Sequence, residues 1–217
     1  MAFDGFFALI LRLATGILAV QDPGQPVGVD DALAWATAVA YHSDRNHLDP
    51  FEMVGIARNE TDFRPALIGP DGKDCGITQT RVTYSRYRCA QLRQDPWLAF
   101  EEAARELSEN QARCSRTARG DLVRCRLNSY NSGVHYARTG WNGTYWLRVS
   151  CFAEAARRGL RPIGDCRSVR DRGDIARIIE RSEALQAVTV AAAPSPSPKA
   201  RAPRPLARAR AARTRAR

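Results

Sequence analysis

Residues 49–80 read DPFEMVGIARNETDFRPALIGPDGKDCGITQT, and this stretch decides the fold. An Asp-Pro pair at its start is typical of a first helical turn, and the apolar residues that follow predict a helix from Asp49 to Glu60. Between Thr61 and Thr80, three glycines and two prolines break the helical pattern. We therefore expect a long ordered loop there, with a short β-hairpin as one form it can take.

Helical patterns also lie on both sides of this stretch, and no sustained strand alternation occurs. Apolar periodicity predicts further helices within residues 30–42, 96–114, 121–132, 144–160 and 168–188. With five or six helices in all, the expected fold class is mainly α, with a loop-rich or small β-hairpin lobe after the second helix.

Charge and composition divide the chain into a body and a tail. Lys and Arg number 33 against 23 Asp and Glu, a net charge of +10 for 217 residues. The Ala/Pro/Arg-rich residues 191–217 hold eight of the basic residues and no acidic ones, which leaves +2 elsewhere. We expect that tail to be disordered and to attract anionic cell-wall polymers or nucleic acid by charge alone. Residues 23–190 suit one domain with a hydrophobic core.

The first 22 residues have two interpretations. The segment from Phe6 to Val20 is apolar but interrupted by Arg12, so it lacks the run of ~18 apolar residues that a membrane span needs. It is either an export leader, removed or degenerate, or a helix packed on the body. The leader interpretation predicts an exported protein of the periplasm, the cell wall or the extracellular space.

The six cysteines favour disulfides over a metal site. An even number behind an export-like leader is typical of an oxidising compartment, and no C-x2-C spacing supports zinc. Sequence order suggests the pairs Cys75–Cys89, Cys114–Cys125 and Cys151–Cys166.

Glu60 has the setting of a general acid. It ends a helix just before the Gly/Pro-rich loop, where the negative end of the helix dipole and apolar neighbours both favour the neutral carboxyl. A neutral carboxyl at ambient pH can protonate a glycosidic oxygen. Taken alone, the position fits an ordinary surface glutamate at a helix end better than a general acid.

Three motifs in order strengthen the functional interpretation. They are Glu-Thr-x-Phe-x-Pro at 60–65, Asp-Cys-Gly-Ile-Thr-Gln at 74–79 and Ser-Tyr-Asn-Ser-Gly at 129–133. Together they resemble the lytic transglycosylases of the soluble-transglycosylase and goose-type-lysozyme-like superfamily, and most closely the short specialised transglycosylases. The chain departs from that pattern at Thr61, at Ile77-Thr78, and at Thr80-Arg81, where the family has Ser, Leu-Met and Ile-Asn.

The resemblance implies a lysozyme-like helical domain, monomeric and without cofactor or metal, that acts on peptidoglycan glycan strands. Glu60 would be the single acid/base that cleaves the β-1,4 bond between N-acetylmuramic acid and N-acetylglucosamine and forms a 1,6-anhydro end. Tyr130 and Asn131 would orient the substrate and the carboxyl. The substrate-binding residues that it implies are Gly76, Gln79, Tyr130, Asn131 and Tyr145. One aromatic residue among Trp141, Tyr145 and Trp146 is a candidate floor for a sugar ring.

Other functions remain open at this point. A water-activating carboxylate at Asp62, Asp71 or Asp74 would make the protein a hydrolytic lysozyme, although we expect loop and turn roles for all three. A catalytically inactive cell-wall-binding module and a nucleic-acid binder acting through the tail are the alternatives from other classes.

Overall fold

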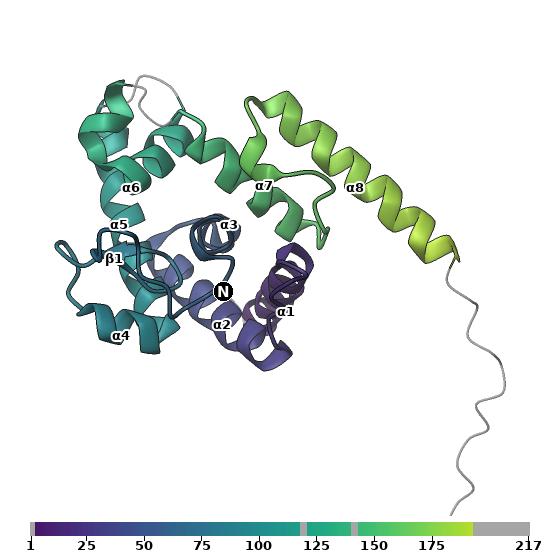
Figure 1. Cartoon of the computed structure of the whole chain (residues 1–217), viewed down its shortest axis with the longest axis horizontal. Helices are drawn as coiled ribbons and strands as arrows, with labels where there is room; N and C mark the ends of the chain where they lie inside the picture. Colours follow the sequence, from purple (N-terminus) through teal and green to yellow (C-terminus); the bar gives the residue numbers. More distant parts are fainter. Residues whose placement is uncertain (1–2, 118–120, 140–142, 193–217) are drawn as a thin grey trace, which may run out of the picture.

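The computed structural model describes residues 3–117, 121–139 and 143–192, and over these the fold is mainly α (Figure 1). The longer helices are α1 (Phe3–Val20), α2 (Val29–Asn46), α3 (Pro50–Thr61), α5 (Pro96–Thr117), α6 (Leu122–Thr139), α7 (Tyr145–Arg157) and α8 (Arg172–Ala192). A short α4 (Cys89–Gln94) and a 3-10 turn η1 (Cys166–Ser168) complete the helices.

Helix α3, which carries Glu60, lies at the centre of the helical body. It packs against α1, α2, α5 and most extensively α7 (Figure 1). Gly55 permits the closest approach, because a Cβ there would lie 2.5 Å from the carbonyl oxygen of Val149 on α7. Asp49 caps the helix by accepting from the Phe51 N–H, and Pro50 occupies the first turn as the sequence predicted.

A small antiparallel hairpin follows α3, in the stretch where a loop or hairpin was expected. Strands β1 (Asp74–Cys75) and β2 (Thr80–Arg81) pair Asp74 with Arg81 and Cys75 with Thr80. The connection between them holds Gly76 and Ile77, both buried. The mainly α class and the hairpin are therefore confirmed, and the closer likeness to a lysozyme lobe stays a prediction.

All three predicted disulfides are present: Cys75–Cys89, Cys114–Cys125 and Cys151–Cys166. The first joins the hairpin to α4, the second joins α5 to α6, and the third joins α7 to η1. Each closes a loop of 11 to 15 residues. These bonds are compatible with an oxidising compartment.

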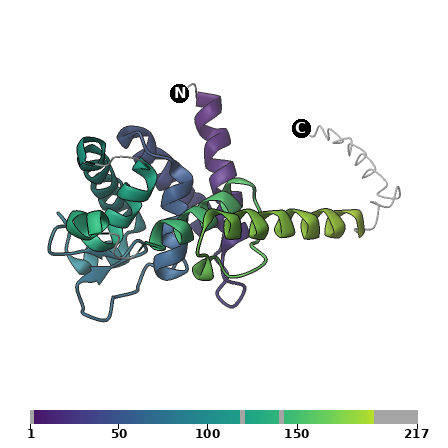
Figure 2. The same ribbon diagram turned by 90° about the horizontal axis from the view of Figure 1, so that it is seen from above.

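Helix α1 contributes to the hydrophobic core. Leu13, Ile17 and Val20 are buried, and a Cβ on Gly16 would lie 2.6 Å from the Ala156 carbonyl oxygen on α7. The N-terminal end of the helix extends beyond its neighbours and leaves Phe7 exposed (Figure 2). This packing supports the second interpretation of the segment, while the division at residue 22 stays a prediction.

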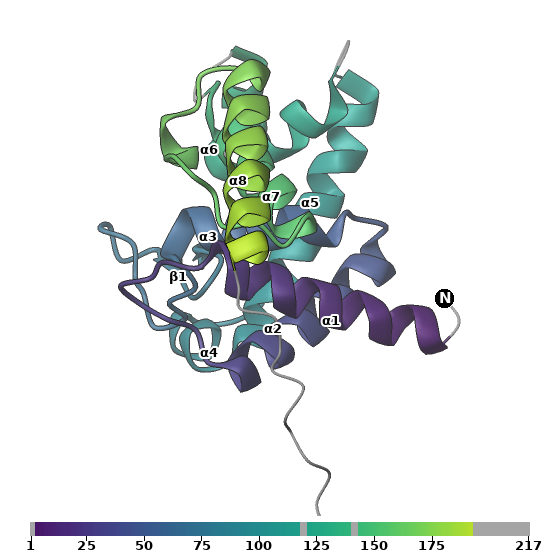
Figure 3. The same cartoon turned by 90° about the vertical axis from the view of Figure 1, so that its right-hand side faces the viewer.

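Helix α8 is the outermost element. It runs across α7 in one view and extends past the body in another (Figures 2 and 3). The helix expected at residues 168–188 begins at Arg172, after the 3-10 turn of residues 166–168. It ends at Ala192, four residues later than expected. The rest of the predicted tail, residues 193–217, lies outside the described residues. None of the described helices is long and apolar enough to cross a membrane.

Candidate active site

Glu60 lies in the last turn of α3, where the chain leaves the helix abruptly. Asp62 and Phe63 both adopt left-handed backbone angles, with φ of 54° and 60°. The Asp62 N–H donates to the Arg58 carbonyl and the Phe63 N–H to the Ala57 carbonyl, so the helix end is closed by its own backbone. This sharp exit leaves Glu60 half-buried instead of directing it into open solvent.

Tyr145 holds the Glu60 carboxyl. Its hydroxyl donates to Glu60 Oε1 over 2.7 Å, and the whole tyrosine side chain is buried at the start of α7. The Arg148 guanidinium lies 5.8 Å from the centre of the Tyr145 ring. Because α3 and α7 pack closely through Gly55, the donor and the carboxyl come from two rigid elements.

The pKa of Glu60 is raised above that of an ordinary glutamate. Burial is the largest cause, since it disfavours the ionised form. Hydrogen bonds from Tyr145 and Asn59 and the charge of Arg148 act in the opposite direction, and the charge of Asp74 adds to the rise. The balance favours a protonated carboxyl, as expected at the sequence level, with burial as its main cause.

Two hydrogen bonds bring the three sequence motifs together. The Thr61 hydroxyl donates to the Ile77 carbonyl over 2.8 Å, which ties the end of α3 to the hairpin. The Tyr130 hydroxyl of α6 donates to the Thr78 carbonyl over 2.8 Å. Glu60 is close enough to contribute to the raised pKa of Tyr130, after burial and the charge of Glu106. The motifs therefore form one site.

Gly76 and Gln79 shape the wall of this site. Gly76 has a φ of +81°, and a Cβ there would lie 2.6 Å from the Leu92 carbonyl oxygen, so only glycine fits. The Gln79 amide donates to the carbonyls of Gly76 and Leu67 over 3.0 and 3.4 Å. In this arrangement Gln79 supports the loop with its amide nitrogen, and the substrate-binding role that the resemblance implied stays a prediction.

Asn131 does not contact the carboxyl as the resemblance implied. Its side chain is exposed, and its amide donates to the hydroxyl of its neighbour Ser132. Gly133 follows with a φ of 72° and ψ of 164°, which breaks the helical path of α6. The exposed position of Asn131 gives no support to a role in orienting Glu60. Its predicted role in binding substrate stays a prediction.

Two of the three candidates for an aromatic floor near this site are buried, so the prediction that one of the three stacks on a sugar ring stays untested. Tyr145 and Trp146 are both buried, so neither presents a ring face to a sugar. The Arg172 guanidinium lies over Trp146, 5.2 Å from the centre of the tryptophan ring. The third candidate, Trp141, lies outside the described residues. Tyr145 belongs to the site through its hydroxyl alone.

The three aspartates named as alternative second carboxylates all lie in ion pairs. Asp62 pairs with Arg58 and Arg167. Asp71 and Asp74 both pair with Arg81 across the hairpin, over 3.1 and 3.3 Å. The expected loop and turn roles agree with these contacts.

Sequence analysis missed Glu106 on α5. Its pKa is raised to about 7, mainly by burial, against the opposing charge of Arg105 and with help from Glu109, Glu102 and Asp74. It also makes the largest charge contribution to the raised pKa of Tyr130, so it lies on the same side of the site. Its only sequence signal is its place beside the buried residues Ala103 and Leu107 of an amphipathic helix.

The site around Glu60 is identified by the hydrogen bonds between its residues rather than by the volume of a cavity. Hollows of about 530 and 840 Å³ lie elsewhere, one between α7 and α8 and the other beside α2 and residues 62–67, and Glu60 lines neither. Among the described residues, no group of three or more His, Cys, Asp or Glu side chains could hold a metal ion. Comparison with family models, curated proteins and solved structures finds no match for this chain.

Proposed function

We propose that the protein is a peptidoglycan lytic transglycosylase with Glu60 as its acid/base. One observation carries the proposal: a half-buried carboxyl with a raised pKa is held by a buried tyrosine where three motifs of the resemblance meet. A structural helix-end glutamate needs neither the burial nor the dedicated donor. The disulfides fit a place in the periplasm or at the cell wall.

The chemistry needs only one carboxyl. Protonated Glu60 gives its proton to the glycosidic oxygen as the bond to C1 of the muramoyl residue breaks. The resulting carboxylate then takes the proton of the muramoyl 6-hydroxyl as that oxygen bonds to C1, which closes the 1,6-anhydro ring and restores the acid. Tyr145 stabilises the intermediate carboxylate through its hydrogen bond.

Digestion of purified peptidoglycan by the full chain tests this proposal. We expect products whose muramoyl ends are lighter by one water than reducing ends, as mass spectrometry would detect. Glu60→Gln should abolish cleavage while glycan binding and cooperative thermal unfolding persist. Cleavage at the wild-type rate by Glu60→Gln would remove Glu60 from the mechanism, and binding without any cleavage by the wild type would indicate an inactive wall-binding module.

Glu106 favours a second candidate, a hydrolytic muramidase. A carboxyl with a pKa of about 7 is partly ionised at neutral pH and could activate a water molecule. In that case the products would carry reducing ends, and Glu106→Gln would abolish them. Anhydro ends that persist in Glu106→Gln exclude this alternative.

A further inference from the structure

A further hollow, also unrelated to Glu60, lies between the end of α2 and the first half of α5. It measures about 390 Å³. Its lining comes from Tyr41, His42, Arg45, Asn46, Arg86, Trp97, Glu101 and Arg105. The proposed reaction uses none of these side chains.

His42 is the first sign that this hollow receives a ligand. Its side chain is 4% exposed, and its Nε2 atom is buried without a hydrogen-bond partner. A buried polar atom without a partner costs about 1–3 kcal/mol, so such atoms are rare in folded proteins. Burial, the largest effect, lowers the pKa of His42, which favours the neutral ring. A group that enters the hollow and bonds to Nε2 would remove that cost.

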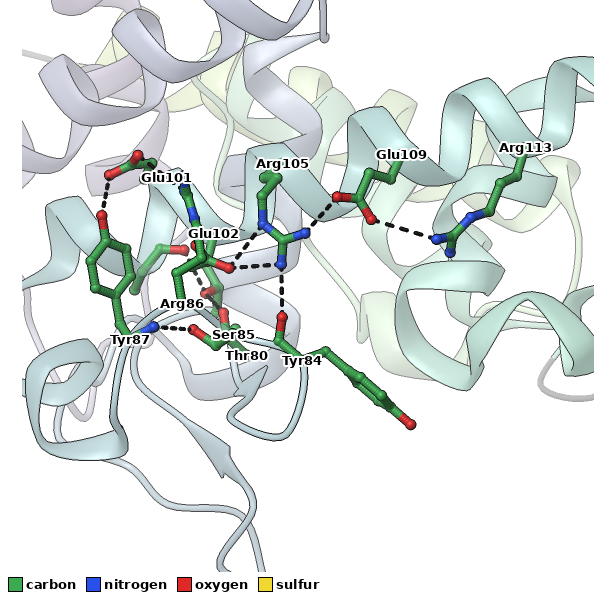
Figure 4. A network of polar contacts seen from close by, with 12 residues as sticks. Thr80, Tyr84, Ser85, Arg86, Tyr87, Glu101, Glu102, Arg105, Glu109 and Arg113 are labelled. Carbon is green, nitrogen blue, oxygen red and sulfur yellow. Dashed lines mark hydrogen bonds and ion pairs between the residues drawn. The ribbon is translucent and has the colours of Figure 1, made fainter.

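Among the described residues, the charges around the hollow leave one arginine without a carboxylate partner. Arg86 pairs with Glu101 and Glu102, and Arg105 pairs with Glu102 and Glu109 (Figure 4). Glu101 also accepts from the Tyr87 hydroxyl over 2.9 Å. These carboxylates are thus engaged by partners on the α5 side of the hollow.

Arg45 differs from those arginines. No carboxylate among the described residues pairs with it, and its guanidinium donates to the Tyr41 hydroxyl over 2.9 Å. It also lies over the Tyr41 ring, 5.5 Å from the centre. The guanidinium therefore keeps donors for an incoming anion.

Two partly exposed aromatic rings flank these polar groups. Tyr41 and Trp97 are 38% and 36% exposed, and their ring centres lie 5.2 Å apart. The His42 ring packs edge-on against both, at 5.1 and 4.8 Å. As far as the described residues show, the hollow thus combines a pair of aromatic rings, one arginine without a carboxylate partner and one histidine nitrogen without a hydrogen-bond partner.

From this arrangement we infer that the hollow binds a carboxylate attached to a short apolar group. A planar carboxylate matches the fork of one guanidinium, and its second oxygen can accept from His42 Nε2 when that atom carries the proton. A single negative charge balances Arg45, which no described carboxylate pairs with, whereas a phosphate dianion would exceed that charge. Tyr41 and Trp97 would cover the apolar part of the ligand.

Two sources could supply such a group: a free small acid, or the carboxyl group of a peptide attached to the glycan strand. The second source rests on the proposed function. The carboxylate site itself does not, because binding there can be measured without any cleavage.

Titration of the full chain with N-acetylalanine tests the site directly. We expect a saturable change in the ring-nitrogen NMR signals of His42, and a much weaker one with the neutral N-acetylalaninamide. Arg45→Gln should weaken binding about tenfold or more, since one charge-assisted contact is lost. The control Arg161→Gln, which removes an exposed arginine with no described contact, should bind as the wild type does.

Equal responses to the acid and the amide would overturn the proposal. So would unchanged affinity in Arg45→Gln, or tighter binding of inorganic phosphate than of N-acetylalanine. Binding of glycan strands to Glu60→Gln then separates the sources. If adding Arg45→Gln weakens binding only to strands that carry peptides, the carboxylate comes from those peptides, and equal binding to peptide-bearing and peptide-free strands assigns it to a free acid.

Discussion

Replacing Tyr145 by phenylalanine removes the hydroxyl that donates to Glu60 over 2.7 Å and keeps the buried ring. A hydrogen bond to a charged group contributes about 1.5–3 kcal/mol, and in the proposed reaction it acts on the carboxylate that forms. If that contribution is lost from the transition state, kcat/KM falls roughly ten- to hundredfold. The matched control is Tyr84→Phe, because the Tyr84 side chain is 76% exposed.

The same variant should also change the pH dependence of kcat/KM, and the direction of that change can be predicted. The Tyr145 hydrogen bond lowers the pKa of Glu60, partly offsetting the effect of burial, so its removal raises that pKa further. Because the first step needs protonated Glu60, the alkaline limb of the kcat/KM profile should move to higher pH in Tyr145→Phe. A limb that moves to lower pH, or a rate and profile equal to those of Tyr84→Phe, would refute this assignment.

Further outcomes concern stability. Glu60→Gln should unfold at a higher temperature than the wild type at pH 8, with little difference at pH 4. The reason is that burial raises the pKa of Glu60 in the folded state, so the wild type loses stability as the pH rises through that pKa and the carboxyl ionises. Gly55→Ala should lower the free energy of unfolding by about 1–3 kcal/mol in denaturant titrations, since its Cβ would meet the Val149 carbonyl, whereas Gly5→Ala meets nothing and should not. Thr61→Val should cost about 1–3 kcal/mol by the same measurement because the Ile77 carbonyl loses its donor, and Thr61→Ser should restore it.

Local sequence signals predicted much of the fold. The Asp-Pro start of α3, the Gly/Pro-rich stretch after Glu60 and the order of the cysteines each act within about 15 residues of chain. Local signals therefore predicted three features without tertiary information: the helix end at the candidate acid, the hairpin and the disulfides. The short α4 was missed because its six residues carry too little periodicity.

Contacts between distant residues required the tertiary structure. Tyr145 and Glu60 are 85 residues apart in the sequence. Tyr145 was a candidate for stacking on a sugar ring, but the packing of α7 on α3 buries it and makes it a hydrogen-bond donor to Glu60. Glu106 on α5 is buried near Tyr130 on α6, and Arg45 on α2 has no carboxylate partner among the described residues, although each reads in the sequence as an ordinary charged residue on a helix. The sequence by itself determined the helix end and the turn around the candidate acid Glu60, because these features depend on neighbouring residues. Only the tertiary structure decided the direction in which the pKa of Glu60 shifts and its hydrogen-bond partner, because desolvation and hydrogen bonding depend on which elements pack around a side chain.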